Sequence, residues 1–386
     1  MSTIAFAERA VHSSHLSVPE ILNVMLETYR GSSDIFFSPG RPPQVEVSGN
    51  LVAAEVPGLT SLTANDTARI ASELIGSNNM ALEKLASDGA CDLSYSVPSL
   101  SRFRVNIFTQ RGSRAVVMRV IPSVIPTLET LGLPPQIGDI TAVSNGLVVV
   151  SGPTASGKSY TLAALIDKIN RERAYHIITI EDPIEFLHAH KKSTVHQREL
   201  HSDAPSFAHA LRAALRQAPR VILVGEMRDR ETIEVALEAA ETGHLVLAAL
   251  HTIDASKTVE RLVSAFPPSD QGHVRSRLAK SFRYIVSQRL IPTKDRQGRV
   301  AAVEILKSTI RTREYVEKGE SNGKSFVDAM RDGALEGMQH FDAEIERLIR
   351  SEAIDMWTGL SYATNPGNLR LQLADFQETS TSEFSS

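Results

Sequence analysis

The segment that most constrains the fold is a glycine-rich stretch at residues 152–159. Its sequence, Gly-Pro-Thr-Ala-Ser-Gly-Lys-Ser, fits the pattern G-x-x-x-x-G-K-[ST]. An apolar run at residues 147–150 precedes it, and a helical stretch at residues 160–170 follows it. This order of strand, loop and helix is the setting that the pattern requires, because the loop and the helix N-terminus then present N–H groups to an anion. The sequence therefore predicts a phosphate site at the edge of a sheet.

Short apolar runs alternate with helical stretches after the loop. They lie at residues 146–150, 176–180, 221–224 and 245–250. Continuous apolar strands separated by helices indicate a parallel sheet that is buried on both faces. We expect this α/β domain to span residues 136–365, with the region from about 270 to 360 mostly helical. The polar stretch at residues 366–386 is typical of a disordered tail.

The first 122 residues have a different pattern, which predicts a smaller α+β domain. Helices are expected at residues 17–31 and roughly 62–86. Short alternating runs predict an antiparallel sheet with one covered face, with strands at 34–38, 44–47, 91–97, 103–109 and 115–121. The stretch from 122 to 135 contains four prolines and no clear period, so residues 123–135 are interpreted as a linker.

Composition excludes several classes of protein. The net charge of −4 over 386 residues argues against a dedicated nucleic-acid binder. A single cysteine, Cys91, excludes a disulfide framework and suits a reducing compartment. No stretch approaches the 18 apolar residues of a membrane span, and the first residues do not resemble a signal peptide. We expect a cytoplasmic protein that reaches a membrane only through partners.

Reactive side chains follow each of the apolar runs. The second run leads into Glu181 and Glu185, the third into Glu226 and the fourth into His251. In an open parallel sheet these positions meet at the carboxyl edge, where sites form. Phosphate hydrolysis needs one carboxylate to orient water and another to organise Mg²⁺, and Glu185 and Glu226 are the candidates. The alternative for a single glutamate is a solvated loop residue.

Two histidines flank the fourth run. Seven residues of strand span roughly 23 Å, so His244 and His251 cannot both contact one phosphate. Only His251 lies at the carboxyl end, and it is the candidate γ-phosphate sensor. For His244, a structural role and an indirect role at the site both stay open.

Three of these segments resemble known motifs. Residues 178–186 resemble the "Asp box" of type II and type IV secretion ATPases, residues 224–229 their variant Walker B, and residues 242–252 their "His box". Within that superfamily the chain is most similar to the type IV pilus retraction ATPases, whose N-terminal domain resembles residues 33–40 and 103–106. The resemblance covers roughly residues 17 to 350.

The resemblance implies a homohexameric ring of PAS-like N-terminal and RecA-like C-terminal domains with Mg·ATP between them. It implies that Glu185 acts on the attacking water and His251 at the γ-phosphate, while Glu226 joins Ser159 in the Mg²⁺ network. N-terminal arginines would complete the site, with Arg104 and Arg119 matching best and Arg102 and Arg111 less well. Their alternative role is on an exposed sheet face. The expected nucleotide-binding residues are Gly152, Pro153, Thr154, Ala155, Ser156, Gly157, Lys158, Ser159 and Tyr160.

The chain also departs from the family pattern. The family usually has glycine where Ala155 stands and threonine where Tyr160 stands. If position 155 needs a positive φ, alanine costs about 1 kcal/mol. A C-terminal helix motif of the family matches residues 309–315 only in part.

The resulting hypothesis is an ATPase motor that removes pilins through an inner-membrane platform protein, together with a second retraction ATPase in some systems. One alternative is an assembly or type II secretion ATPase, although the extra N-terminal domain and four-cysteine insert of those chains have no counterpart here. Another is an accessory subunit that binds nucleotide without hydrolysing it. A RecA-type DNA motor is disfavoured by the acidic balance.

Overall fold

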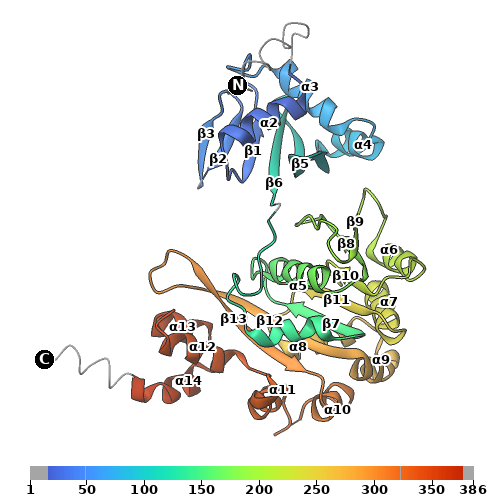
Figure 1. Ribbon diagram of the computed structural model, residues 1–386, viewed down its shortest axis with the longest axis vertical. Helices are drawn as coiled ribbons and strands as arrows, with labels where there is room; N and C mark the ends of the chain where they lie inside the picture. The colour runs from blue at the N-terminus through green and yellow to red at the C-terminus, as the bar shows by residue number, and fades with distance from the viewer. Residues whose placement is uncertain (1–15, 48, 123, 322, 377–386) are drawn as a thin grey trace, which may run out of the picture. The chain divides into compact units, whose positions relative to one another are not determined.

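The computed structural model describes residues 16–47, 49–122, 124–321 and 323–376 (Figure 1). The chain divides near residue 123 into two compact units, and residues 185–187 are grouped with the first of them.

The first unit is built on a six-stranded antiparallel sheet, as the alternation predicted. Its strand order is β3-β2-β1-β6-β5-β4. The strands are β1 (Asp34–Phe37), β2 (Gln44–Val47), β3 (Asn50–Ala53), β4 (Ala90–Val97), β5 (Ser101–Gln110) and β6 (Ser113–Ile121). Alternate side chains such as Phe103 and Met118 are buried in one core, whereas their neighbours Arg104 and Arg119 are exposed. The sheet therefore has one covered face.

Three helices supply the rest of that core. The first, α2 (Val18–Thr28), lies where the sequence predicted a helix, and the Glu20 carboxylate accepts the Ser17 N–H at 2.8 Å. The single helical stretch predicted at 62–86 is wrong in detail, because it is two helices, α3 (Ala64–Ile75) and α4 (Asn79–Asp88). Gly76 interrupts it with a φ of 54°, and the Asn78 side chain caps α4. Glycine tolerates this conformation at little cost.

The second unit contains a seven-stranded sheet in the order β13-β12-β7-β11-β10-β8-β9. Neighbouring strands run parallel, except for the antiparallel pair β12–β13. The four predicted apolar strands are β7 (Gly146–Ser151), β8 (His176–Glu181), β10 (Val221–Val224) and β11 (Leu245–Leu250). Every residue of β7 and β11 is buried. The prediction of a parallel sheet buried on both faces is confirmed.

Helices cover both faces of this sheet (Figure 1). One core contains α5 (Lys158–Glu172) and the 3₁₀ helix η1 (Pro135–Ala142). The other core contains α6 (Phe207–Ala214), α7 (Arg230–Glu241), α8 (Ala255–Ser264) and α9 (Pro268–Ser281). This layering leaves the carboxyl ends of β7, β11, β10 and β8 at one edge.

The expectation that residues 270–360 are mostly helical is wrong for two long strands, β12 (Phe282–Pro292) and β13 (Arg299–Lys307). Most residues of β13 are buried, so its sequence lacks the alternation that marks a half-exposed strand. The edge strands β3 and β9 (Thr194–Glu199) were also not predicted. The helices here are α10 (Ile310–Lys318), α11 (Phe326–Asp332), η2 (Ala334–Glu336), α12 (Phe341–Arg350) and α13 (Met356–Tyr362).

The predicted disordered tail is also wrong in its first part. Residues 366–372 form helix α14 (Pro366–Gln372), and Asn365 caps it by accepting the Asn368 N–H at 3.1 Å. Leu369 and Leu373 are fully buried in a cluster with residues of β12 and α12. Burial of Leu369 within the helix and of Leu373 at its C-cap stabilises α14 against the cluster. Residues 377–386 lie outside the described part of the chain.

Candidate nucleotide site

The glycine-rich segment leaves β7 and enters α5, as the sequence predicted. Gly157 is the N-cap of α5 and has a φ of 90°, so α5 begins at Lys158. Ser159 and Tyr160 follow in the first turn, and the Tyr160 side chain is 46% exposed. The first N–H groups of a helix have no partner within the helix, so they are available to an anion. The loop is therefore a candidate phosphate cradle.

Backbone geometry explains two residues of the loop. A Cβ at Gly152 would lie 2.3 Å from Ser156 Oγ and 2.5 Å from the Gln288 carbonyl oxygen, so only glycine fits there. Ala155 has a φ of 62°, in the left-handed region where an L-residue with a side chain is strained. Position 155 therefore does have the positive φ that would favour glycine, and alanine there costs about 1 kcal/mol relative to glycine.

Lys158 lies inside the loop and is only 7% exposed. Its Nζ donates to the carbonyl oxygens of Gly152 at 3.0 Å and Pro153 at 2.9 Å. The same Nζ lies 3.4 Å from His251 Nδ1. The ammonium group is thus held between the start of the loop and the end of β11.

His251 and Glu226 continue this group of side chains. His251 Nε2 lies 3.5 Å from Glu226 Oε1, and Glu226 Oε2 lies 2.7 Å from Arg228 Nε. The hydrogen bond and charge of Glu226 raise the pKa of Arg228 above its ordinary value. Lys158, His251 and Glu226 therefore come together from the ends of three neighbouring strands, β7, β11 and β10.

This arrangement suits Mg²⁺ with a polyphosphate. Mg²⁺ is typically bound by one or two protein oxygens together with phosphate oxygens and water. Ser159 and Glu226 offer such oxygens beside the loop. Within the described ranges no cluster of three or more His, Cys, Asp or Glu side chains could hold a metal ion alone. A metal here would depend on the nucleotide for much of its coordination.

The segment after β8 carries Glu185. Thr179 Oγ1 and Gln197 Nε2 donate to Glu181 Oε1 at 2.6 and 3.1 Å. The Ile184 N–H donates to the buried carboxylate of Glu199 at 3.0 Å, which anchors the residue before Glu185. Glu185 itself is exposed, and its role in activating water stays a proposal.

Three of the four candidate arginines, Arg102, Arg104 and Arg119, lie on the exposed face of the N-terminal sheet, and Arg111 lies in a turn. Arg104 and Arg119 are direct cross-strand partners on β5 and β6. Arg119 Nε pairs with Asp34 Oδ1 at 2.9 Å, Arg102 donates to Ser96 Oγ at 3.1 Å, and Arg111 lies in the β5–β6 turn with a φ of 48°. The structure supports the sheet-surface role for Arg119 and leaves a catalytic role for either arginine as a proposal.

His244 lies at the other end of β11 from His251. Its Nδ1 lies 3.0 Å from the Ala239 carbonyl oxygen near the C-terminus of α7, and its backbone N–H donates to the same oxygen at 3.1 Å. These contacts close the turn between α7 and β11. The structure therefore favours the structural role that the sequence left open.

Sequence reasoning missed the strand beneath the loop. Gln288 of β12 is 1% exposed, its carbonyl oxygen occupies the space that a Cβ at Gly152 would need, and its Nε2 donates to Thr161 Oγ1 of α5 at 2.8 Å. It also missed Arg228, although that residue belongs to the segment 224–229. The position of Gln288 had no signal in the sequence, since β12 was expected to be helical.

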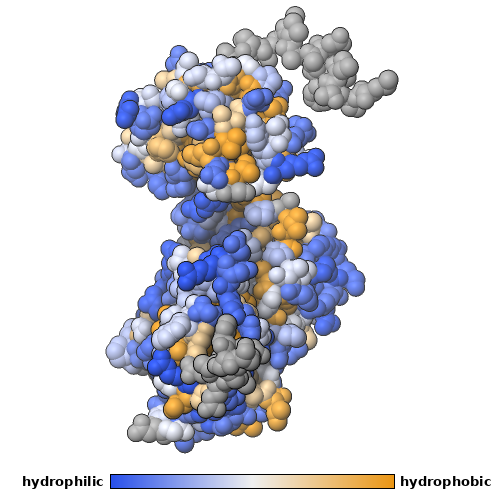
Figure 2. All heavy atoms as spheres, turned by 90° about the vertical axis from the view of Figure 1, so that its left-hand side faces the viewer, coloured by the Kyte–Doolittle hydropathy of each residue, from blue (hydrophilic) through white to orange (hydrophobic). Residues whose placement is uncertain are grey.

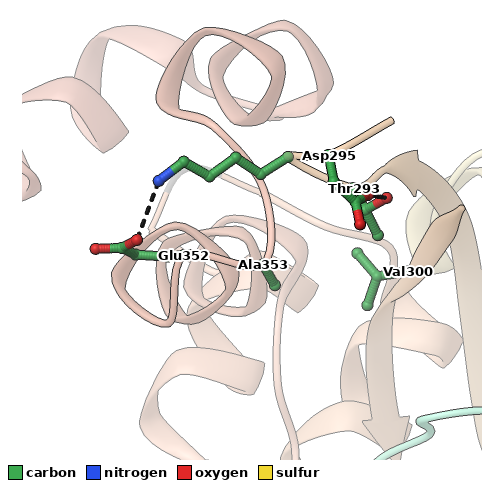
Figure 3. Close-up of a pocket in the computed structure, with 6 residues that line it drawn as sticks. Thr293, Asp295, Val300, Glu352 and Ala353 are labelled. Atoms are coloured by element: carbon green, nitrogen blue, oxygen red, sulfur yellow. Dashed lines mark hydrogen bonds and ion pairs between the residues drawn. The ribbon is translucent and has the colours of Figure 1, made fainter. Parts of the chain in front are cut away.

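One further cavity exists in the second unit, between the β12–β13 turn and the end of α12 (Figure 3). It measures about 530 Å³, and the Lys294–Glu352 ion pair at 3.0 Å lies at its border. None of the candidate nucleotide residues lines it.

The α/β fold and the convergence at one sheet edge define a candidate P-loop nucleotide-binding protein. The family model described as "Type II/IV secretion system protein" matches residues 14–375, so the chain belongs to this family.

Individual relatives show which members of this family the chain is similar to. The "Type IV pilus retractation ATPase PilT" of Pseudomonas aeruginosa is 42% identical over 339 residues, which are 88% of this chain and 96% of that protein. The "Type IV pilus ATPase PilU" of the same organism is 36% identical and covers 95% of this chain and 94% of its own length. Among solved structures, the "Pilus Retraction Motor PilT and Bound ADP" has a TM-score of 0.81 and 40% identity, and covers 92% of this chain and 99% of its own.

Proposed function

We propose that this chain is the Mg²⁺-dependent ATPase that powers retraction of a type IV pilus, the process behind twitching motility. The observation that carries the proposal is the group formed by Lys158, His251 and Glu226 beside the glycine-rich loop. Its similarity to PilT over nearly its whole length supports the direction of work.

Each residue of the site has a proposed role. The loop from Gly152 to Tyr160 holds the phosphates with backbone N–H groups, and Lys158 reaches the β and γ phosphates. When bound there, Mg²⁺ would supply positive charge that offsets the charge developing on the phosphate oxygens. Ser159 and Glu226 hold the metal, His251 senses the γ-phosphate, and Glu185 orients the attacking water.

The proposed assembly is a homohexamer of PAS-like and RecA-like domains, at residues 1–122 and 136–365, joined by the linker 123–135. Arg104 and Arg119 are proposed to complete a nucleotide site. Exposed apolar residues support subunit contacts: Leu51 and Val52 of the edge strand β3 are 55% and 39% exposed, and Figure 2 shows hydrophobic residues on the surface of the first unit. Free strand edges readily pair with other chains.

The proposed partners are an inner-membrane platform protein and a second retraction ATPase. No helix in the described ranges is both long and apolar enough to cross a membrane. We propose that the ring works at the cytoplasmic face of the membrane through the platform protein.

The alternative of an accessory subunit rests on the similarity to PilU and on Ala155 and Tyr160. The geometry favours the active motor, because Ala155 adopts the left-handed backbone that the family's glycine allows and the exposed Tyr160 ring does not block Lys158 from the loop carbonyls.

The test is phosphate release by the purified full-length chain with and without Mg²⁺. We expect Mg²⁺-dependent hydrolysis that disappears in Lys158→Ala, because that cation contacts the transferred phosphate. The rate of phosphate release should fall on the order of a hundredfold in Glu226→Gln and in Glu185→Gln, which is the scale of losing a positioned catalytic group.

The control is Lys294→Ala, which removes an ammonium group of the same unit at the separate cavity. Its turnover should equal that of the wild type. Wild-type turnover no higher than that of Lys158→Ala would contradict the proposal and favour the accessory subunit.

A further inference from the structure

Glu304 is a buried carboxylate that the proposed mechanism does not use. It lies on β13 opposite Ser287 of β12 and is 3% exposed. Its Oε1 accepts the N–H of Ala255 at 2.8 Å, and the Ser287 side chain also bonds to it. A buried carboxylate is costly unless its contacts repay the loss of water. These contacts therefore stabilise the buried Glu304 carboxyl group.

The Ala255 N–H is the first of helix α8. Asp254 caps this helix by accepting the Lys257 N–H at 2.7 Å, so Glu304 supplies a second acceptor for the unpartnered N–H groups of the first turn. A negative charge here also interacts favourably with the helix dipole. Only residues 252–254 separate this contact from His251, so the hydrogen bond lies at the end of the loop that carries His251.

A chain of hydroxyl groups, three of them buried, connects the same region to the phosphate loop. Ser287 Oγ lies 3.0 Å from Ser151 Oγ, which accepts from Thr258 Oγ1 at 3.1 Å. Thr258 Oγ1 lies 2.6 Å from Thr252 Oγ1, next to His251. Ser151 is the last residue of β7 and directly precedes Gly152. The network thus connects β7, which leads into the phosphate loop, with β12 beneath that loop and with the segment that carries His251.

We infer that Glu304 is a positioning residue of the nucleotide site, which fixes the His251 loop relative to the strand that leads into Gly152. The inference rests on the proposed function, since it assigns Glu304 a part in the same ATPase site. Glu304 acts through Ala255 and Ser287 and does not itself reach the phosphates.

The ionisation of Glu304 gives this role a pH dependence. Burial raises its pKa to about 7, helped by the charge of Asp254 and opposed by the Ala255 N–H, Arg289 and Ser287. Asp254 faces it from the start of α8 and Arg289 from β12; Arg289 donates to the Tyr362 carbonyl oxygen and stacks on Phe341. Above about pH 7 the carboxylate is charged and holds the Ala255 N–H more strongly.

Folding stability changes in the opposite direction. The unfolded carboxyl group loses its proton near its ordinary pKa of 4.5, whereas the folded one keeps it up to about pH 7. Between these values the folded state binds more protons, so the free energy of unfolding falls as the pH rises. Glu304→Gln removes this fall, and its thermal midpoint should rise relative to the wild type as the pH increases from 5 to 8.

The kinetic test compares Glu304→Ala, Glu304→Gln and a control, Glu344→Gln. Glu344 is also a buried carboxylate at 5% exposure, but it pairs with Arg347 on α12, outside the network. Glu304→Ala should lower kcat for ATP about tenfold with little change in KM, the scale of one hydrogen bond to a charged group. The wild-type kcat should rise through pH 7, and this rise should be absent from Glu304→Gln but present in Glu344→Gln.

A second measurement does not depend on hydrolysis. Hydrogen exchange in a peptide covering residues 251–264 should be about tenfold faster in Glu304→Ala and unchanged in Glu344→Gln. If the wild type hydrolyses no ATP, the proposed function fails while the exchange result still tests the positioning. Should Glu304→Ala not fold, the pH profile of Glu304→Gln decides. Unchanged exchange and kcat in Glu304→Ala, or a rise through pH 7 that persists in Glu304→Gln, would overturn the inference.

Discussion

Ala155 illustrates how one residue in the loop can be unusual without changing its geometry. It is exposed and has a φ of 62°, while Gly152 in the same loop has contacts that exclude any Cβ. The two positions therefore restrict their residue for different reasons. Gly152 is fixed by a close approach of other atoms, whereas Ala155 only bears a backbone strain that the rest of the loop offsets.

We expect Ala155→Gly to stabilise the protein, because it relieves the left-handed strain of about 1–2 kcal/mol. Glycine loses more conformational entropy on folding than alanine, but this cost is smaller than the strain that is relieved. The net gain of up to about 1 kcal/mol should raise the thermal midpoint by about 2–4 °C. The affinity for ATP should stay within about twofold, since the backbone already has the required conformation. Thermal unfolding and nucleotide titration measure both quantities.

Ala218→Gly is the matched control, because Ala218 is also exposed with a positive φ of 51° but lies outside the loop. It should show a similar gain in midpoint. A lower midpoint for Ala155→Gly alone would mean that the alanine methyl group makes a stabilising contact in the loop.

Individual site residues were predictable where a pattern marks them. Lys158 belongs to a spaced motif, and Glu226 and His251 follow apolar strands whose carboxyl ends must meet. Glu304 and Gln288 had no such mark. Each acts through contacts between segments far apart in the chain, such as the Gln288 bond to Thr161, and no local pattern reports those contacts.

At the level of elements, burial decided which predictions succeeded. The apolar strands β7 and β11 lie at the centre of the sheet and were found from composition alone. The strand β9 has a free edge, and its sequence Thr-Val-His-Gln-Arg-Glu is mostly polar. An edge strand needs fewer apolar residues, because part of its surface meets water. The same polarity made the sequence of α14 look like a disordered tail.

Helix α14 provides a test of whether the C-terminal cluster is stable. Leu369→Ala should destabilise that cluster by about 2–4 kcal/mol, because it empties a fully buried site. Trp357 is the only tryptophan of the chain and lies on α13, with the Arg370 guanidinium 5.6 Å from its ring centroid. Its fluorescence during urea unfolding therefore reports on this region.

Leu371→Ala is the matched control on the same helix, because that side chain is 75% exposed. Its effect should stay within about 0.5 kcal/mol. Equal midpoints for Leu369→Ala and the wild type would show that α14 is not packed in solution and that the tail prediction was right.

At the scale of the whole molecule, the sequence separated an antiparallel region from a parallel one, because the two sheets bury their strands differently. It could not predict that β12 lies between β7 and β13, far from β7 in sequence. That pairing places Gln288 and Ser287 beneath the loop and joins it to the helices after β13.

Whether the motor assembles or retracts pili is a property of the whole molecule. An assembly motor and a retraction motor can share the site around Lys158, so hydrolysis alone does not separate them. We expect cells that lack this chain to keep assembled pili which cannot retract, because the proposed nucleotide-driven pull on a platform protein would be lost. Such cells should carry more surface pili than the parent and move less by twitching, as counted by microscopy and followed with labelled pili. Wild-type chain supplied in trans should restore retraction, and Lys158→Ala should not. A deletion strain without surface pili, even after removal of a second retraction ATPase, would assign this motor to assembly, whereas normal retraction would assign it the accessory role.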